Sequence, residues 1–144
     1  MRVCLGVVDV PYGYGDNPEA TTGEVAQDLE NNYQLFTHFQ EMHMDVIRKD
    51  AGEALALALI NHIKYGVPLA SDGEQLSETM REFHLFLELE EMAGLGVEGV
   101  PTQAALQGKN SRLKREYGDR RPSFIDGGLF KANFIAWIEN DGKS

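Results

Sequence analysis

The two ends of the chain carry the alternating hydrophobic pattern of β-strands. Near the N-terminus Val3, Leu5 and Val7 alternate with their neighbours in VCLGVVDV, and Pro11 ends the run. Near the C-terminus, residues 129–139 are rich in aromatic and β-branched side chains, which favour pleated, half-buried strands. The pattern therefore predicts strands over residues 3–10 and 129–139, paired with each other.

Between these ends, apolar residues recur at helical spacing. Thr21 stands three residues before Glu24, the capping-box pattern that begins a helix, here over residues 22–32. The run NNYQLF interrupts the pattern and predicts a break at residues 31–35. A longer helix is expected over residues 37–65, ended by Gly66, and its most apolar part, AGEALALALINHI, is predicted to be the main core element.

Two further helices are predicted in the second half of the chain. Residues 76–94 place an apolar stripe on one face, and residues 102–107 begin with Thr102 as a cap. The turn residues Asp126, Gly127 and Gly128 then lead into the second strand. The expected fold class is α+β: one domain, 1–144, with a small antiparallel sheet from the terminal strands, packed on two or three helices, with long exposed loops.

Charge is distributed unevenly along the chain. The net charge is −10, yet residues 109–121 (KNSRLKREYGDRR) hold six of the 13 Lys and Arg residues. An acidic body argues against general nucleic-acid binding, because most of the surface repels phosphate. The basic stretch remains able to contact DNA, or to dock on the acidic face of a neighbouring copy.

The sequence contains no hydrophobic segment of the type that spans a bilayer. No apolar run approaches the roughly 18 residues that such a segment needs. The N-terminal run MRVCLGVVDV does not have the pattern typical of a signal peptide, because its apolar run is short and alternates into Asp9. No membrane partner is expected, and the chain is expected to stay in the cytoplasm where it is made.

The most suggestive catalytic pattern is HFQEMHMD, which contains His38, Glu41, His43 and Asp45. A helical zinc-protease site needs two histidines four residues apart. Here they are five apart, about 140° out of phase on an α-helix, and two ligands are too few for a catalytic zinc site. A polar helix face is the favoured interpretation. A small metal-dependent hydrolase using His38, Glu41 and His43 is kept as an alternative.

The remaining candidates favour structural roles. Cys4 is expected to be a small buried hydrophobe, His62 and His84 interior or boundary histidines, and the run Glu88, Glu90, Glu91 a solvated face. The sequence has no phosphate-binding glycine loop and no Gly-x-Ser-x-Gly elbow. The expectation is a protein that is not an enzyme and has no catalytic residue, no metal site and no cofactor.

Candidate contact residues lie in the loops and in the basic stretch. Two tyrosines in PYGYGDNPEA either fold back onto the domain or serve as anchors on a partner, and the sequence favours neither alternative. Together with four arginines they form the predicted protein interface: Tyr12, Tyr14, Arg112, Arg115, Arg120 and Arg121.

Motifs at both ends and in the helices resemble one family. The segments GVVDV, TTGEVAQDLE, LALALINHI and RPSFIDGGLFKANFIAWIE occur in the order seen in neck and tail-completion proteins of tailed bacteriophages and prophages, the virion-morphogenesis or minor tail proteins. Gly127 and Asn133 stand where that family usually has threonine and serine.

The resemblance implies a role in particle assembly. It implies an α+β fold, ring homo-oligomers at the head–tail junction or tail end, and no catalysis. The implied partners are other copies of the chain and other phage head–tail or tail proteins, with genome DNA in a channel left open. The implied location is the virion, assembled in the host bacterial cytoplasm. A binding module that acts during assembly without joining the particle is a further alternative.

Overall fold

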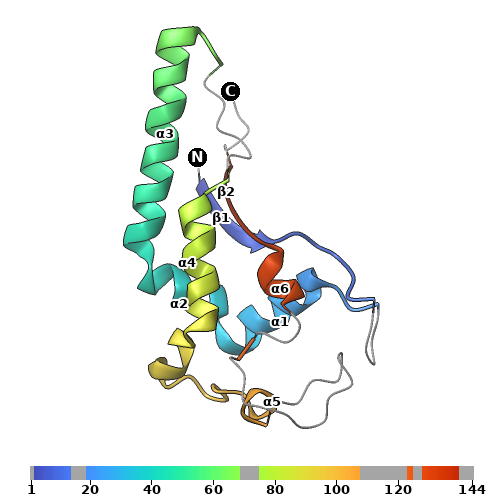
Figure 1. Cartoon of the computed structure of the whole chain (residues 1–144). Helices are drawn as coiled ribbons and strands as arrows, with labels where there is room; N and C mark the ends of the chain where they lie inside the picture. Colours follow the sequence, from blue (N-terminus) through green and yellow to red (C-terminus); the bar gives the residue numbers. More distant parts are fainter. Residues whose placement is uncertain (1, 14–18, 69–74, 108–122, 125–127, 140–144) are drawn as a thin grey trace.

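The computed structural model describes residues 2–13, 19–68, 75–107, 123–124 and 128–139. In chain order the elements are β1 (Arg2–Val7), α1 (Thr22–Tyr33), α2 (Leu35–Met42), α3 (Met44–Tyr65), α4 (Ser77–Glu88), the 3-10 helix η1 (Glu91–Leu95), α5 (Gln103–Leu106), α6 (Leu129–Ala132) and β2 (Phe134–Glu139) (Figure 1). A small sheet and many helices make this an α+β fold, as the sequence predicted.

The terminal strands pair antiparallel, which confirms the predicted sheet. Arg2 stands opposite Glu139 and Val7 opposite Phe134. The other edge of β2 is covered by the segment before α4, where the Leu76 N–H donates to the Ala136 carbonyl at 2.9 Å. β1 is the open edge, since no further strand pairs with it in the part of the chain that the structure describes.

The second strand begins at Phe134, five residues later than the predicted start at Leu129. Residues 129–132 form the short helix α6, because Gly128 takes a left-handed conformation (φ 85°) and its carbonyl accepts the Ala132 N–H at 2.9 Å. This turn buries Phe130 in the core. The first strand also ends earlier than predicted, at Val7, although the Val8 N–H still donates to the Asn133 carbonyl at 2.8 Å.

The start of α1 follows the local sequence signal. The Thr21 hydroxyl accepts the Glu24 N–H at 3.2 Å, and the Glu24 carboxylate accepts the Thr21 N–H at 3.2 Å, so the predicted capping box is present. The predicted break is also confirmed, because Gln34 is left-handed (φ 53°) and separates α1 from α2.

Two predicted helices are each divided in the structure. The helix expected over residues 37–65 is split at His43, whose backbone (φ −118°, ψ 26°) leaves the helical region, into α2 and α3. The helix expected over residues 76–94 ends at Glu88, because Glu90 is left-handed (φ 52°) and cannot continue a right-handed helix. The predicted cap of α5 is present, with the Thr102 hydroxyl accepting the Ala105 N–H at 3.2 Å.

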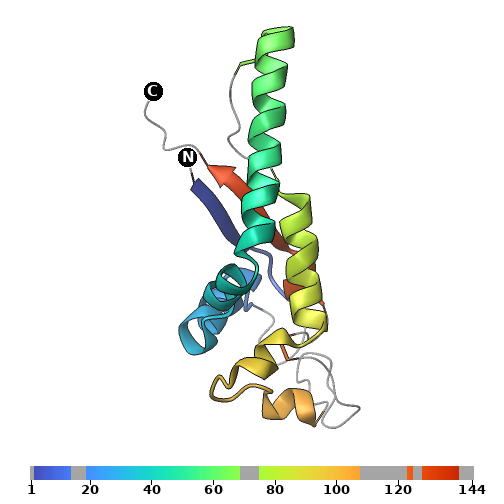
Figure 2. The ribbon, with the colours of Figure 1, turned by 90° about the vertical axis from the view of Figure 1, so that its left-hand side faces the viewer.

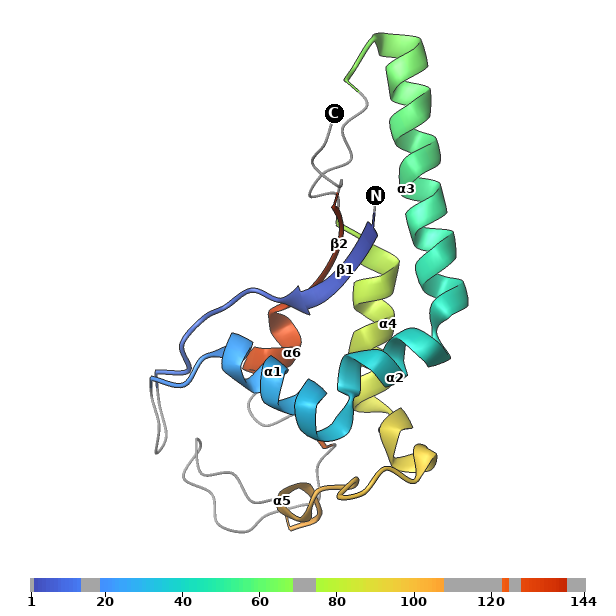
Figure 3. The same ribbon diagram turned by 180° about the vertical axis from the view of Figure 1, so that it is seen from behind.

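The core is aromatic and lies between α2, α4 and β2. The rings of Phe83 and Phe134 stack with centroids 3.8 Å apart, and Phe39 meets Phe83 edge-on at 5.1 Å. All three side chains are fully buried. Figure 2 and Figure 3 show that α4 packs along the sheet. They also show that α1 and α6 lie together at the end of the sheet where β1 finishes and β2 begins.

The apolar half of α3 is not the main core element that the sequence predicted. Only Ile47 and Ala51 of this helix are buried. Beyond them α3 extends past α4 and past the sheet, as Figure 1 and Figure 2 show. None of the helices that the structure describes is both long and apolar enough to cross a membrane.

Candidate functional site

The projecting end of α3, residues 55–65, is the first candidate surface, and we call it the α3 arm. Its large apolar side chains are exposed, Ile63 at 73% and Tyr65 at 74%. The exposed set along the arm comprises Leu57, Leu59, Ile60, Ile63 and Tyr65. At 100° per residue these positions point in all directions around the helix. Helices that are apolar on every side are normally buried ones.

A groove continues the apolar surface of the arm toward the sheet. It has a volume of about 430 Å³ and runs between Val3 and Leu5 on β1 and Met44, Ile47 and Leu55 on α3. The groove therefore lies between β1 and α3. Leu55, at the start of the arm, also lines the groove, so the arm and the groove meet at this residue.

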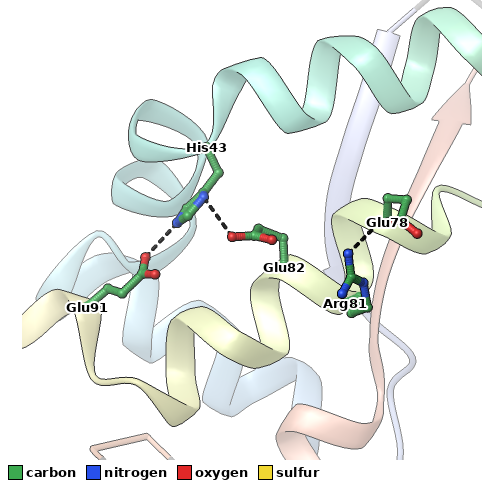
Figure 4. Close-up of polar contacts among 5 residues, drawn as sticks. All are labelled: His43, Glu78, Arg81, Glu82 and Glu91. Atoms are coloured by element: carbon green, nitrogen blue, oxygen red, sulfur yellow. Dashed lines mark hydrogen bonds and ion pairs between the residues drawn. The ribbon is translucent and has the colours of Figure 1, made fainter.

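A second candidate site lies at the other end of α3, at the hinge with α2. The His43 imidazole is held between two carboxylates from other elements (Figure 4). Its Nδ1 lies 3.3 Å from Glu82 Oε1 on α4, and its Nε2 lies 2.6 Å from Glu91 Oε2 on η1. We call these three residues the His43 cluster.

The His43 cluster is half-buried and its ring is held by aromatic neighbours. The exposed fractions of the side chains are 14% for His43, 23% for Glu82 and 24% for Glu91. The His43 ring contacts Phe39 at 5.3 Å and Phe86 at 5.9 Å between centroids. Within the described residues this is the one group of three or more His, Cys, Asp or Glu side chains close enough to share a metal ion.

The cluster differs from the metal site considered from the sequence. His38 and Glu41 lie on α2 and do not belong to it. Glu91 was expected on a solvated face, but it is half-buried against His43, because the chain turns at Glu90 and brings η1 back to the hinge. No local sequence pattern indicates this pairing, since the two residues stand 48 positions apart.

The predicted interface residues are placed only in part. Tyr12 is buried (8% exposed), and its N–H donates to the Ala20 carbonyl at 2.9 Å, so it folds back onto the domain rather than standing out as an anchor. The other predicted contact residues, Tyr14, Arg112, Arg115, Arg120 and Arg121, lie outside the described residues.

Of three other predicted positions, two differ from the prediction and one agrees with it. Cys4 is half-buried rather than buried, and desolvation, together with the Glu139 carboxylate, raises the pKa of its thiol. His62 is exposed rather than interior, with Nδ1 2.8 Å from the Val67 carbonyl oxygen. His84 lies at the boundary as predicted, and its buried Nε2 has no hydrogen-bond partner among the residues described.

Comparison with known proteins does not assign the chain to a class. A scan against protein-family models, a search of curated proteins and a search of solved structures each return no match.

Proposed function

We propose that this chain is a non-catalytic structural subunit of a tailed phage or prophage particle, assembling as a ring at the head–tail junction or tail end. The observation that carries the proposal is the α3 arm. A helix that exposes Leu59, Ile63 and Tyr65 on different sides leaves a large apolar area in water. Burial of that area against another protein contributes roughly 25 cal/mol per Å², so the arm favours assembly.

The charge distribution supports contact between copies. Residues 1–108 contain 5 basic and 18 acidic residues, whereas residues 109–121 contain 6 basic and 2 acidic residues. A basic stretch on one copy and an acidic body on the next fit a head-to-tail interface, the type that closes into rings. The resemblance of the terminal motifs to phage neck and tail-completion proteins supports the same role.

The geometry does not favour the hydrolase alternative built on His38, Glu41 and His43. His43 is turned toward Glu82 and Glu91, and the other two residues remain on α2. An assembly-stage binding module would use the same α3 arm, but against a different chain. Whether the purified chain associates with itself therefore separates this alternative from the ring subunit.

Native mass spectrometry over a concentration series tests the proposal. The wild-type chain should form a closed oligomer of defined size. The double variant Leu59→Gln/Ile63→Gln should need at least about tenfold more protein to associate, since each lost apolar contact weakens the interface by about 1–3 kcal/mol. Leu89→Gln is the matched control, because this exposed leucine lies away from the arm, just after α4.

A chain that remains monomeric at every concentration would contradict self-assembly. If the oligomer forms equally well in the arm double variant, a different surface holds the copies together. The corresponding genetic expectation is that genes for portal, capsid and tail proteins stand beside the gene for this chain.

A further inference from the structure

The His43 imidazole lies between two carboxylates. Both ring nitrogens face carboxylate oxygens, at 3.3 Å and 2.6 Å. A neutral imidazole carries one N–H, so its second nitrogen would direct a lone pair at a carboxylate, which repels it. A metal cation at this point could accept an imidazole lone pair and a carboxylate oxygen from each glutamate.

A divalent cation would balance the charge of the two carboxylates. With a divalent cation and a neutral imidazole, the three side chains and the ion are neutral together. The neighbouring cation on α4, Arg81, forms its ion pair with Glu78 at 2.7 Å and interacts more weakly with Glu82. Uncompensated charge is costly in a half-buried site such as this one.

We propose that His43, Glu82 and Glu91 bind a divalent transition-metal cation, Zn²⁺ first among them. Zn²⁺ accepts one imidazole nitrogen and two carboxylate oxygens, and water completes a tetrahedron. Mg²⁺ and Ca²⁺ prefer ligand sets made entirely of oxygen, so the histidine selects against them. This inference goes beyond the proposed assembly role and does not depend on it.

The ligand atoms are close to the required geometry. One atom from each residue lies within 4.8 Å of the other two. Ligands in a tetrahedron around zinc, each about 2 Å from the ion, lie about 3.4 Å apart. The glutamate side chains are partly exposed, and a change of rotamer would bring their carboxylates to the ion. The rings of Phe39 and Phe86 pack on the His43 ring and hold the nitrogen ligand.

Cation binding would fix the direction of the α3 arm. His43 is the hinge between α2 and α3, Glu82 belongs to α4, and Glu91 begins η1. One ion bound to all three ties the base of α3 to the body of the domain. A cation that binds the folded chain and not the unfolded chain also stabilises it, by an amount that grows with the concentration of free cation.

Isothermal titration of the full metal-free chain with Zn²⁺, and separately with Mg²⁺, tests the site. One Zn²⁺ should bind per chain and raise the melting temperature, with Mg²⁺ binding far more weakly. Glu82→Gln and Glu91→Gln should each weaken Zn²⁺ binding at least about tenfold. A tenfold loss of affinity is the smallest effect usually seen when a residue that only supports a metal ligand is replaced. His43→Gln should abolish binding.

The matched controls are His38→Gln and Glu41→Gln, which alter the same residue types on α2 and should bind Zn²⁺ as the wild type does. Absence of Zn²⁺ binding, binding that survives in all three cluster variants, or loss of binding in a control would overturn the proposal. If circular dichroism shows that His43→Gln does not fold, Glu82→Gln and Glu91→Gln still decide the question, because they preserve side-chain volume. Ring formation is scored separately, by native mass in the presence of a chelator.

Discussion

The carboxylate of Asp50 on α3 accepts two hydrogen bonds from Thr79 in the first turn of α4, one from the backbone N–H at 2.8 Å and one from the hydroxyl at 2.9 Å. The residue that precedes α4, Leu76, supplies no side-chain cap. A neighbouring helix therefore caps α4, and the negative charge lies where the helix dipole favours it. The same contact fixes α3 against α4 at the base of the arm.

Replacement of Asp50 by alanine should lower the free energy of unfolding by about 1–3 kcal/mol, because Thr79 then has a buried hydroxyl and an N–H without their charged acceptor. Urea denaturation at neutral pH measures the change. Asp50→Asn, which keeps one acceptor oxygen, should cost less. Glu53→Ala, an exposed position one turn further along α3, is the control and should change stability by less than about 0.5 kcal/mol.

The start of α2 is capped in a similar way by Glu30 of α1. Its Oε2 accepts the N–H groups of Phe36 at 2.8 Å and Thr37 at 3.3 Å, and Oε1 accepts the Thr37 hydroxyl. Glu30→Ala should cost about 1–2 kcal/mol, as loss of an N-cap does. Amide hydrogen exchange at Phe36 and Thr37 should accelerate more than exchange elsewhere in α2. Uniform acceleration along α2 would contradict a local capping role.

Phe83 is the centre of the aromatic core, stacked on Phe134 and in edge contact with Phe39. Phe83→Ala should therefore cost about 3–5 kcal/mol, the usual penalty for removing a buried phenylalanine. Since small domains are stable by about 5–15 kcal/mol, this variant should unfold at a much lower urea concentration. Leu89→Ala, at a 68% exposed position, should leave the midpoint nearly unchanged. Equal effects of the two changes would contradict the assigned core.

The ion pair between Glu88 and Lys131 joins α4 to α6 at 2.6 Å and gives a pH dependence. The Lys131 ammonium, which donates a hydrogen bond to the Glu88 carboxylate, lowers the pKa of that group below its ordinary value of 4.5. A carboxyl group with a lowered pKa in the folded state stabilises the fold above its ordinary pKa, and this stability is lost as pH falls through the lowered value.

Wild type should therefore be more stable than Glu88→Gln at pH 7, and the difference should disappear on acidification below pH 4.5. Thermal melts across this range measure it. The difference should be small, because exposed pairs are screened by water and salt. A difference that persists unchanged in acid would show that the glutamine acts through packing rather than charge.

The parts of the fold that were predicted correctly depend on residues that are close to each other in the sequence. Thr21 and Glu24 lie within one helical turn, so their capping box forms whatever surrounds it. The alternation in each terminal segment specified a strand with one buried face, and two such strands with no other partner were expected to pair. The apolar character of the α3 arm was equally plain in the sequence.

Only the tertiary structure decided which distant groups meet and which apolar surface is covered. Asp50 and Thr79 are 29 residues apart, and His43 and Glu91 are 48 apart, so no local pattern pairs them. Hydrophobic periodicity indicates that a helix has apolar faces. The packing of the whole chain determines whether other elements cover those faces. In this protein α3 extends beyond α4 and the sheet, and the large apolar side chains of the arm from Leu57 onward are left exposed.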